Sequence, residues 1–105
     1  MNTLTNNFDS IEHLIYAEQL RIETIDIHPE LDLMLVVLNT KAVLHQKLSN
    51  YSLFKKANKE ALMQFEINAN GTGVHWPLLD EDLSLKGFLR DELKNLTKKS
   101  NAVAA

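Results

Sequence analysis

The stretch LDLMLVVLN, residues 31–39, constrains the fold most strongly because it is apolar without interruption from Leu33 to Leu38. Side chains alternate between the two faces of a strand, so a strand here is apolar on both faces. Such a strand is usually central in its sheet and covered on both sides. The run is also far shorter than the ~18 apolar residues that a membrane-spanning helix needs. We therefore expect a central, doubly covered strand and no membrane span.

Two further strands are predicted beside this one. LRIETIDI (20–27) precedes it and is rich in β-branched residues, and AVLHQKL (42–48) follows it. In residues 20–27 the alternation of apolar and polar side chains is interrupted near Glu23 and Thr24, which indicates a β-bulge. The connections HPELD and NTK are short, so neighbouring strands should be antiparallel.

The rest of the chain alternates between helical and strand patterns. Asp9 and Glu12 are spaced as a capping box at the start of a helix, and Asn58 divides a helical stretch. That stretch places Leu53 on the same face as its buried residues. Helices are predicted at residues 9–19, 49–64 and 84–96, and Ser84 caps the last of them. A closing hairpin is predicted from strands at 65–69 and 72–76, joined by a type I′ turn at Asn70-Gly71.

This order predicts an α+β fold in a single domain, residues 1–105. Its antiparallel sheet should have about five strands, as a two- or three-strand meander plus the closing hairpin. Helices should pack beside the sheet. Residues 1–7 and 99–105 are expected to be flexible tails.

Charge and composition exclude several functional classes. The chain has 14 acidic residues against 11 Lys and Arg, a net charge of -3, which does not favour nucleic acid as a partner of this chain alone. It has no cysteine, so a disulfide, a thiolate metal site and a cysteine nucleophile are excluded. The first residues lack the basic and apolar regions of a signal peptide, so we expect a cytoplasmic protein.

The segment GTGVHWPLLDEDLSLKG, residues 71–87, combines a histidine, three acids and the single tryptophan. One interpretation is a small-molecule or metal-binding enzyme that uses His75 with Asp80–Asp82. Three adjacent acids on a turn point in different directions, however, and they also complement the dipole of the following helix. The four histidines are not spaced as metal ligands. We therefore predict no catalytic residue, no metal site and no cofactor.

The tryptophan itself favours the core, with an interface hot spot as the alternative. His75 should face away from the core, because it alternates with Val74 and Trp76. A partner-binding surface is predicted around the tryptophan, made of Trp76, Pro77, Leu78, Leu79, Asp80, Asp82 and Leu83.

Residues 20–89 resemble a small bacterial domain-of-unknown-function family, the one numbered twenty-four forty-two. The resemblance rests on LMLVVLNTKAVLHQKL, on NYSLFKKA and above all on FEINANGTGVHWPLLDEDLSLKGFL, which carries the family's Gly-x-Gly-hydrophobic-x-Trp-Pro and Leu-Asp-Glu-Asp-Leu-Ser signature. The chain departs from the pattern at Thr40-Lys41, where the family's first hairpin turn usually has a glycine.

The resemblance implies a compact α+β fold and a role as an antitoxin-like partner, because members are often encoded beside small toxin-like proteins. It transfers no catalytic residue. Some members carry a helix-turn-helix module, for which this chain has no second helix after Ser84.

We therefore expect a non-enzymatic protein-interaction module whose partner is another protein, such as a toxin encoded nearby. A homodimer is a further expectation, because the terminal helices have apolar faces to bury. A DNA-associated regulator is the remaining alternative.

Overall fold

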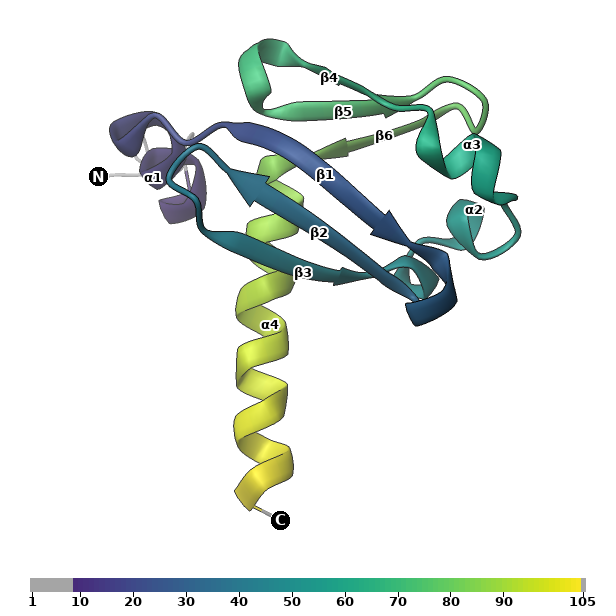
Figure 1. Ribbon diagram of the computed structural model, residues 1–105. Helices are drawn as coiled ribbons and strands as arrows, with labels where there is room; N and C mark the ends of the chain where they lie inside the picture. Colours follow the sequence, from purple (N-terminus) through teal and green to yellow (C-terminus); the bar gives the residue numbers. More distant parts are fainter. Residues whose placement is uncertain (1–8, 105) are drawn as a thin grey trace.

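The computed structural model describes residues 9–104, with side chains described up to residue 97, and it has an α+β fold. The elements follow the chain from the N-terminal helix to the long C-terminal helix (Figure 1). They are α1 (Ser10–Glu18), β1 (Ile22–His28), β2 (Leu33–Leu38), β3 (Val43–Lys47), α2 (Ser52–Lys55), α3 (Lys59–Met63), β4 (Glu66–Asn68), β5 (Gly73–Trp76), β6 (Glu81–Ser84) and α4 (Leu85–Ala104).

The first sheet is an antiparallel meander in the order β1-β2-β3, which confirms β2 as a central strand. The register between β1 and β2 shifts between Ile22 and Thr24, at the position where the alternation slips in the sequence. A bulge there keeps Ile22 and Ile25 on the same, buried face although they are three positions apart in the sequence.

The second sheet, in the order β4-β5-β6, corrects the predicted single sheet of about five strands. Strand β6 is not among the predicted elements: residues 81–84 pair with β5, and α4 begins directly after them. The β4–β5 connection is also longer than a two-residue type I′ turn. Ala69, Asn70 and Gly71 all have positive φ, at 51°, 56° and 85°.

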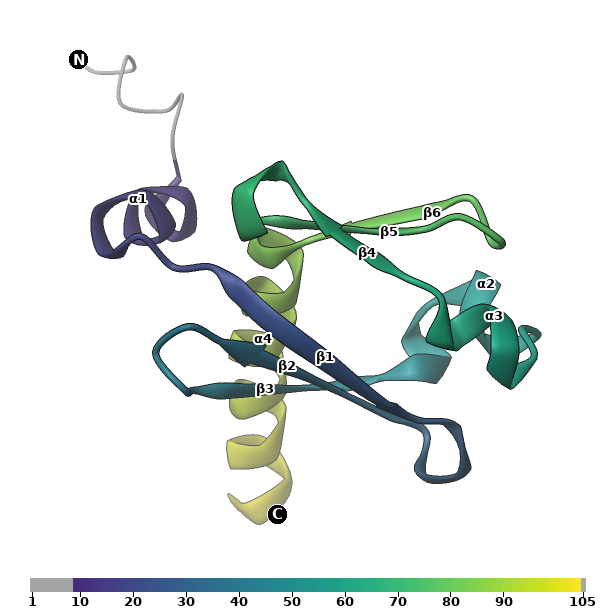
Figure 2. The same cartoon turned by 45° about the horizontal axis from the view of Figure 1, so that its top comes forward.

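The core lies between the inward faces of the two sheets and the first turns of α4. Met34 and Val36 of β2, Val74 and Trp76 of β5 and Phe88 of α4 belong to one buried cluster. Figure 2 shows the second sheet above the first, with α4 passing behind β2 and β3. Within the described residues, no helix is both long enough and apolar enough to cross a bilayer.

The helix boundaries follow their capping residues. The Asp9 side chain accepts from the backbone N–H of Glu12, and the Glu12 side chain accepts from that of Asp9, so the predicted capping box of α1 is confirmed. Asn58 caps α3 and separates it from α2. Ser84 Oγ accepts from the Gly87 N–H at 3.1 Å, so it caps α4 although it ends β6.

The expectation that β2 is covered on both faces is wrong. Met34, Val36 and Leu38 are buried, whereas the alternate residues of the strand, Leu33, Leu35 and Val37, are only half-buried. The face that carries them is turned towards the viewer in Figure 1, and no described element lies over it.

The predicted tails at 1–7 and 99–105 stay a prediction. Residues 1–8 and 105 lie outside the described residues, and the backbone of 99–104 continues α4.

Candidate partner-binding surface

Trp76 is the internal support of the predicted surface. Its side chain is fully buried, with the ring centroids of Phe54 and Phe65 at 4.8 Å and 5.9 Å. Its indole N–H donates to the backbone carbonyl of Leu62 at 3.0 Å. These contacts attach α2, through Phe54, and α3, through Leu62, to the end of the second sheet. The interpretation of Trp76 as a core residue is therefore confirmed, and Trp76 itself is not available to a partner.

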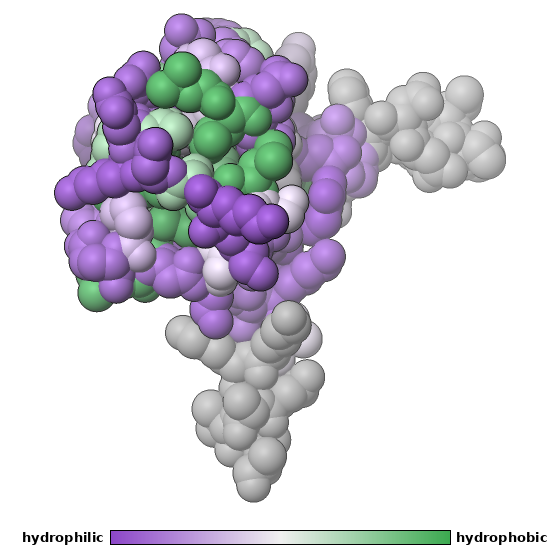
Figure 3. All heavy atoms as spheres, turned by 90° about the vertical axis from the view of Figure 1, so that its right-hand side faces the viewer, coloured by the Kyte–Doolittle hydropathy of each residue, from purple (hydrophilic) through white to green (hydrophobic). Residues whose placement is uncertain are grey.

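Three exposed apolar side chains neighbour the residues that hold Trp76. Leu53 precedes Phe54, Met63 follows Leu62, and Leu78 lies two positions after Trp76. Their exposed fractions are 46%, 40% and 59%. Hydrophobic side chains gather on the face of the molecule that α2, α3 and the β5–β6 turn share (Figure 3). We call Leu53, Met63 and Leu78, with Pro77, the apolar surface.

The β5–β6 turn places Leu78 on the outside. Pro77 ends β5 and is exposed, and the N–H of Leu79 donates back to the Trp76 carbonyl at 3.2 Å. Asp80 completes the turn with a φ of 51°, a region that aspartate tolerates better than most residues. The turn therefore follows Trp76 directly, and it leaves the Leu78 side chain exposed.

The other predicted residues divide between the core and the surface. Leu79 and Leu83 are half-buried and pack against the core cluster. Asp80 and Asp82 are exposed.

Two members of the apolar surface are not predictable from the sequence pattern. One continuous helical period predicts Leu53 on the buried face, and it does not mark Met63. The helical stretch breaks into short helices at 52–55 and 59–63, so each buries its own residues, Phe54 on α2 and both Ala61 and Leu62 on α3. The exposed positions follow from that break rather than from one continuous helical period.

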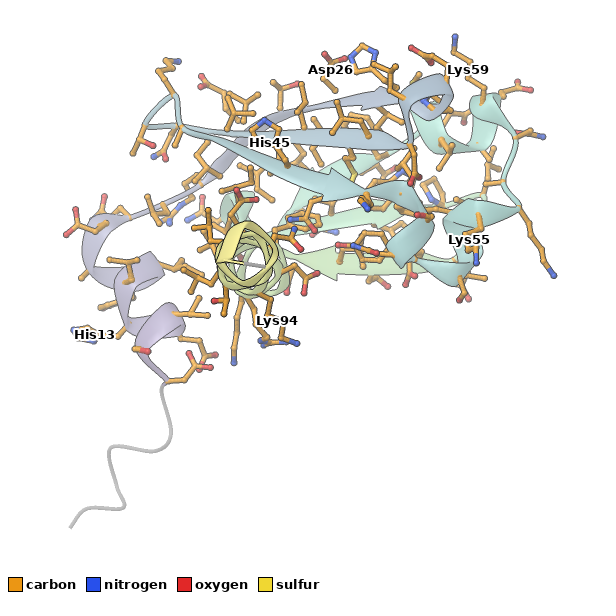
Figure 4. The ribbon with its side chains drawn as sticks, turned by 90° about the horizontal axis from the view of Figure 1, so that it is seen from below. His13, Asp26, His45, Lys55, Lys59 and Lys94 are labelled. Carbon is orange, nitrogen blue, oxygen red and sulfur yellow. The ribbon has the colours of Figure 1, made fainter. Side chains whose placement is uncertain are left out.

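Cations flank the apolar surface. Lys55, Lys56 and Lys59 lie on α2, in the link between the helices and on α3, and all three are exposed. Figure 4 shows Lys55 and Lys59 at the end of the molecule that α2 and α3 form. None of the ion pairs among the described residues involves these lysines, so their charges are available to a partner.

Only some of the residues that an enzyme would use, His75 and Asp80–Asp82, lie close together. His75 lies on the outer face of β5, as predicted, opposite Asp82 of β6, and its Nδ1 is 2.9 Å from Asp82 Oδ1. Asp80 takes part in none of the hydrogen bonds or ion pairs among the described residues. No group of three His, Asp or Glu side chains in the described part of the chain is placed to hold a metal ion. The pair lies on the outer face of the second sheet, where the Asp82 side chain is 73% exposed.

A second polar cluster lies behind the apolar surface. The Tyr51 hydroxyl donates to Gln46 Oε1 at 2.7 Å, and Asp91 Oδ2 lies 3.4 Å from the same hydroxyl. Burial raises the pKa of Tyr51, and the nearby charge of Asp91 raises it further. The tyrosine is therefore held neutral as a donor to Gln46. Its ring packs on Phe54 at 5.3 Å, so this cluster also fixes α2.

Comparison with known proteins gives a family but no activity. The model of a protein family of unknown function, DUF2442, matches residues 22–93. No curated protein matches the chain.

Two solved structures share the fold. A protein of unknown function from Rhodospirillum rubrum is 25% identical, with a TM-score of 0.62 over 69% of this chain and 87% of the other. The uncharacterized protein CV0863 from Chromobacterium violaceum is 26% identical, with a TM-score of 0.63 over 86% of this chain and 82% of the other. The match to the family model spans both sheets and the start of α4, so this chain belongs to the DUF2442 family of proteins of unknown function.

Proposed function

We propose that this protein is a protein-interaction module, and that its partner binds at the apolar surface formed by Leu53, Met63, Leu78 and Pro77. The observation that carries the proposal is the exposure of three large apolar side chains around one fully buried tryptophan. Single exposed leucines are ordinary on protein surfaces, but exposed apolar side chains that gather on one face commonly mark an interaction site.

The support beneath this surface favours tight binding. Trp76, Phe54 and Phe65 form an aromatic cluster that holds α2 and the turn in place before a partner arrives. A surface that is ordered in advance loses less conformational entropy on binding. The partner should present an apolar side chain for the centre of the surface and carboxylates for the lysines at its edge.

The partner class that we propose is a small toxin encoded beside this gene, which would make the protein antitoxin-like. The proposal rests on the family resemblance together with this surface. The chain would act by covering the toxin, without converting a substrate.

Co-expression with the product of the adjacent gene tests the proposal. We expect the wild-type chain to copurify with that product and to restore growth when the product is toxic. Leu78→Glu should weaken binding by at least about tenfold, because it places a charge at the centre of a desolvated contact. Leu14→Glu is a matched control, since Leu14 is 49% exposed on α1 and lies outside the surface.

Circular dichroism and the melting temperature should be unchanged in both variants, because both side chains are exposed. Equal binding by the wild-type chain and Leu78→Glu would contradict the proposed surface. Absence of any complex with the wild-type chain at micromolar concentration would contradict the toxin as partner.

A further inference from the structure

The outer face of the first sheet is apolar along its central strand, where an exposed antiparallel sheet is usually polar. Leu33, Leu35 and Val37 of β2 project from it, and Val43 of β3 lies opposite Val37 and is 40% exposed. Strands β1 and β3 lie on either side of β2, so these residues form an apolar stripe along the middle of the face. No described helix or loop covers the stripe (Figure 1).

The two borders of this stripe carry different charges. Strand β1 contributes Asp26, and the adjoining turn contributes Glu30, whose carboxylates flank His28 at 2.9 Å and 3.5 Å. Strand β3 contributes His45 and Lys47. Figure 4 shows Asp26 and His45 on the side of the sheet that faces away from the rest of the molecule.

The strand register places residues of the two borders in common rows across the sheet. Asp26, Leu35 and His45 form one row across the three strands. His28, Leu33 and Lys47 form the next row. Each row therefore has an apolar centre, with Asp26 and His45 at the ends of the first row and His28 and Lys47 at the ends of the second.

From this pattern we infer that the outer face of the first sheet binds a second copy of the chain. A two-fold axis parallel to the strands stacks the stripe of one copy on the stripe of the other. The same rotation places β1 of each copy over β3 of its partner. Lys47 of each copy then faces His28 of the other copy, which lies between the carboxylates of Asp26 and Glu30. Attraction between these opposite charges at both sides of the interface favours this arrangement over an unrelated partner.

Strand addition at the β3 edge competes poorly with this stacking. The outward N–H of His45 already donates to the Glu92 carboxylate of α4 at 3.0 Å. The middle of that edge is therefore occupied within one copy, while the face remains open. This inference is independent of the apolar surface proposed for the toxin, because the two surfaces share no residue.

Sedimentation velocity of the full chain between about 1 and 100 μM provides the first test, over a range typical for moderate association. We expect a dimer whose fraction rises with concentration. Leu35→Glu should make the chain monomeric, because it places a charge in the centre of the stripe. Leu78→Glu is the control and should leave the dimer intact.

Charge reversal keeps the inference testable if Leu35→Glu fails to fold. Asp26→Lys replaces one of the two carboxylates beside His28 with a lysine, and Lys47→Glu replaces the lysine of β3 with a carboxylate. Each variant alone should dimerise at least about tenfold more weakly than the wild-type chain, because each substitution weakens the attraction between the facing borders. An equimolar mixture of the two should dimerise with nearly wild-type affinity, because the mixed dimer has an opposite-charge pair at each side.

A wild-type chain that stays monomeric throughout the concentration range would overturn the inference. A dimer that survives Leu35→Glu with its folded signal intact would also overturn it. So would a dimer that is lost in Leu14→Glu, because Leu14 is 49% exposed on α1, outside the first sheet. If a mixture of the two charge variants dimerises no more tightly than either variant alone, the proposed orientation is excluded.

Discussion

Gln46 is a fully buried polar side chain, and its two hydrogen bonds explain why the core tolerates it. Its Nε2 donates to the Phe88 carbonyl at 3.2 Å, and its Oε1 accepts from the Tyr51 hydroxyl. Tyr51→Phe leaves that oxygen without a donor, and a buried polar atom left unpaired costs about 1–3 kcal/mol. We expect a fall of this size in the free energy of unfolding, measured by urea denaturation. Tyr16→Phe, at a position that is 78% exposed, should change nothing, and equal effects would contradict the account.

His28 gives a prediction about pH. Its hydrogen bond to Asp26 raises its pKa above 6.5, and Glu30 adds to the effect. The folded state therefore holds the proton more tightly than the unfolded state. The resulting stabilisation is fully present below about pH 6.5, the unfolded pKa, and is lost as the pH rises through the folded pKa of His28.

Proton NMR titration of the His28 ring measures this effect directly. Asp26→Asn removes the main cause, so the pKa of His28 should fall towards its ordinary value. Asp80→Asn, in the β5–β6 turn, should leave the pKa of His28 where it is in the wild-type chain. An unchanged pKa in Asp26→Asn would show that the carboxylate is not the cause.

At the scale of elements, two glycines differ in what their positions require. Gly71 has a φ of +85°, and a Cβ added there would lie 2.8 Å from the Cβ of Arg21. Gly71→Ala should therefore destabilise the chain by about 1–2 kcal/mol. A Cβ at Gly87 meets only Ser84 Oγ, at 3.4 Å, so Gly87→Ala should stabilise α4 by about 0.5–1 kcal/mol. Thermal unfolding of both variants gives the signs, and shifts in the same direction would contradict this description of the two positions.

Elements with a clear pattern were predictable from the sequence, and β6 shows why others were not. The capping box of α1, the bulge of β1 and the break at Asn58 each depend on a few neighbouring residues. Strand β6 has the sequence EDLS, which has low β-propensity and a single apolar side chain. It forms a strand because its backbone hydrogen-bonds to the edge of β5. That pairing depends on the tertiary structure and leaves no periodic pattern in the local sequence.

At the scale of the whole molecule, the division into two sheets determines both surfaces. Periodicity indicated that β2 has two apolar faces, and it predicted that the fold covers both. The second sheet and α4 cover one of them only, so the chain buries Met34 and leaves Leu35 half-exposed. Part of the candidate site was predictable, because Pro77 and Leu78 belong to the surface predicted from the WPLLDED segment. Leu53 and Met63 were not predictable, because their exposure follows from the break between α2 and α3.

The central claim is that partners bind at Leu53, Met63 and Leu78 and not at the His75–Asp82 pair. Amide chemical shifts of the isotopically labelled chain, followed by NMR during addition of the adjacent gene's product, test this claim most directly. We expect the largest shifts to cluster on α2, on α3 and on residues 77–79. Largest shifts around His75 and Asp82, with the three apolar positions unchanged, would contradict it.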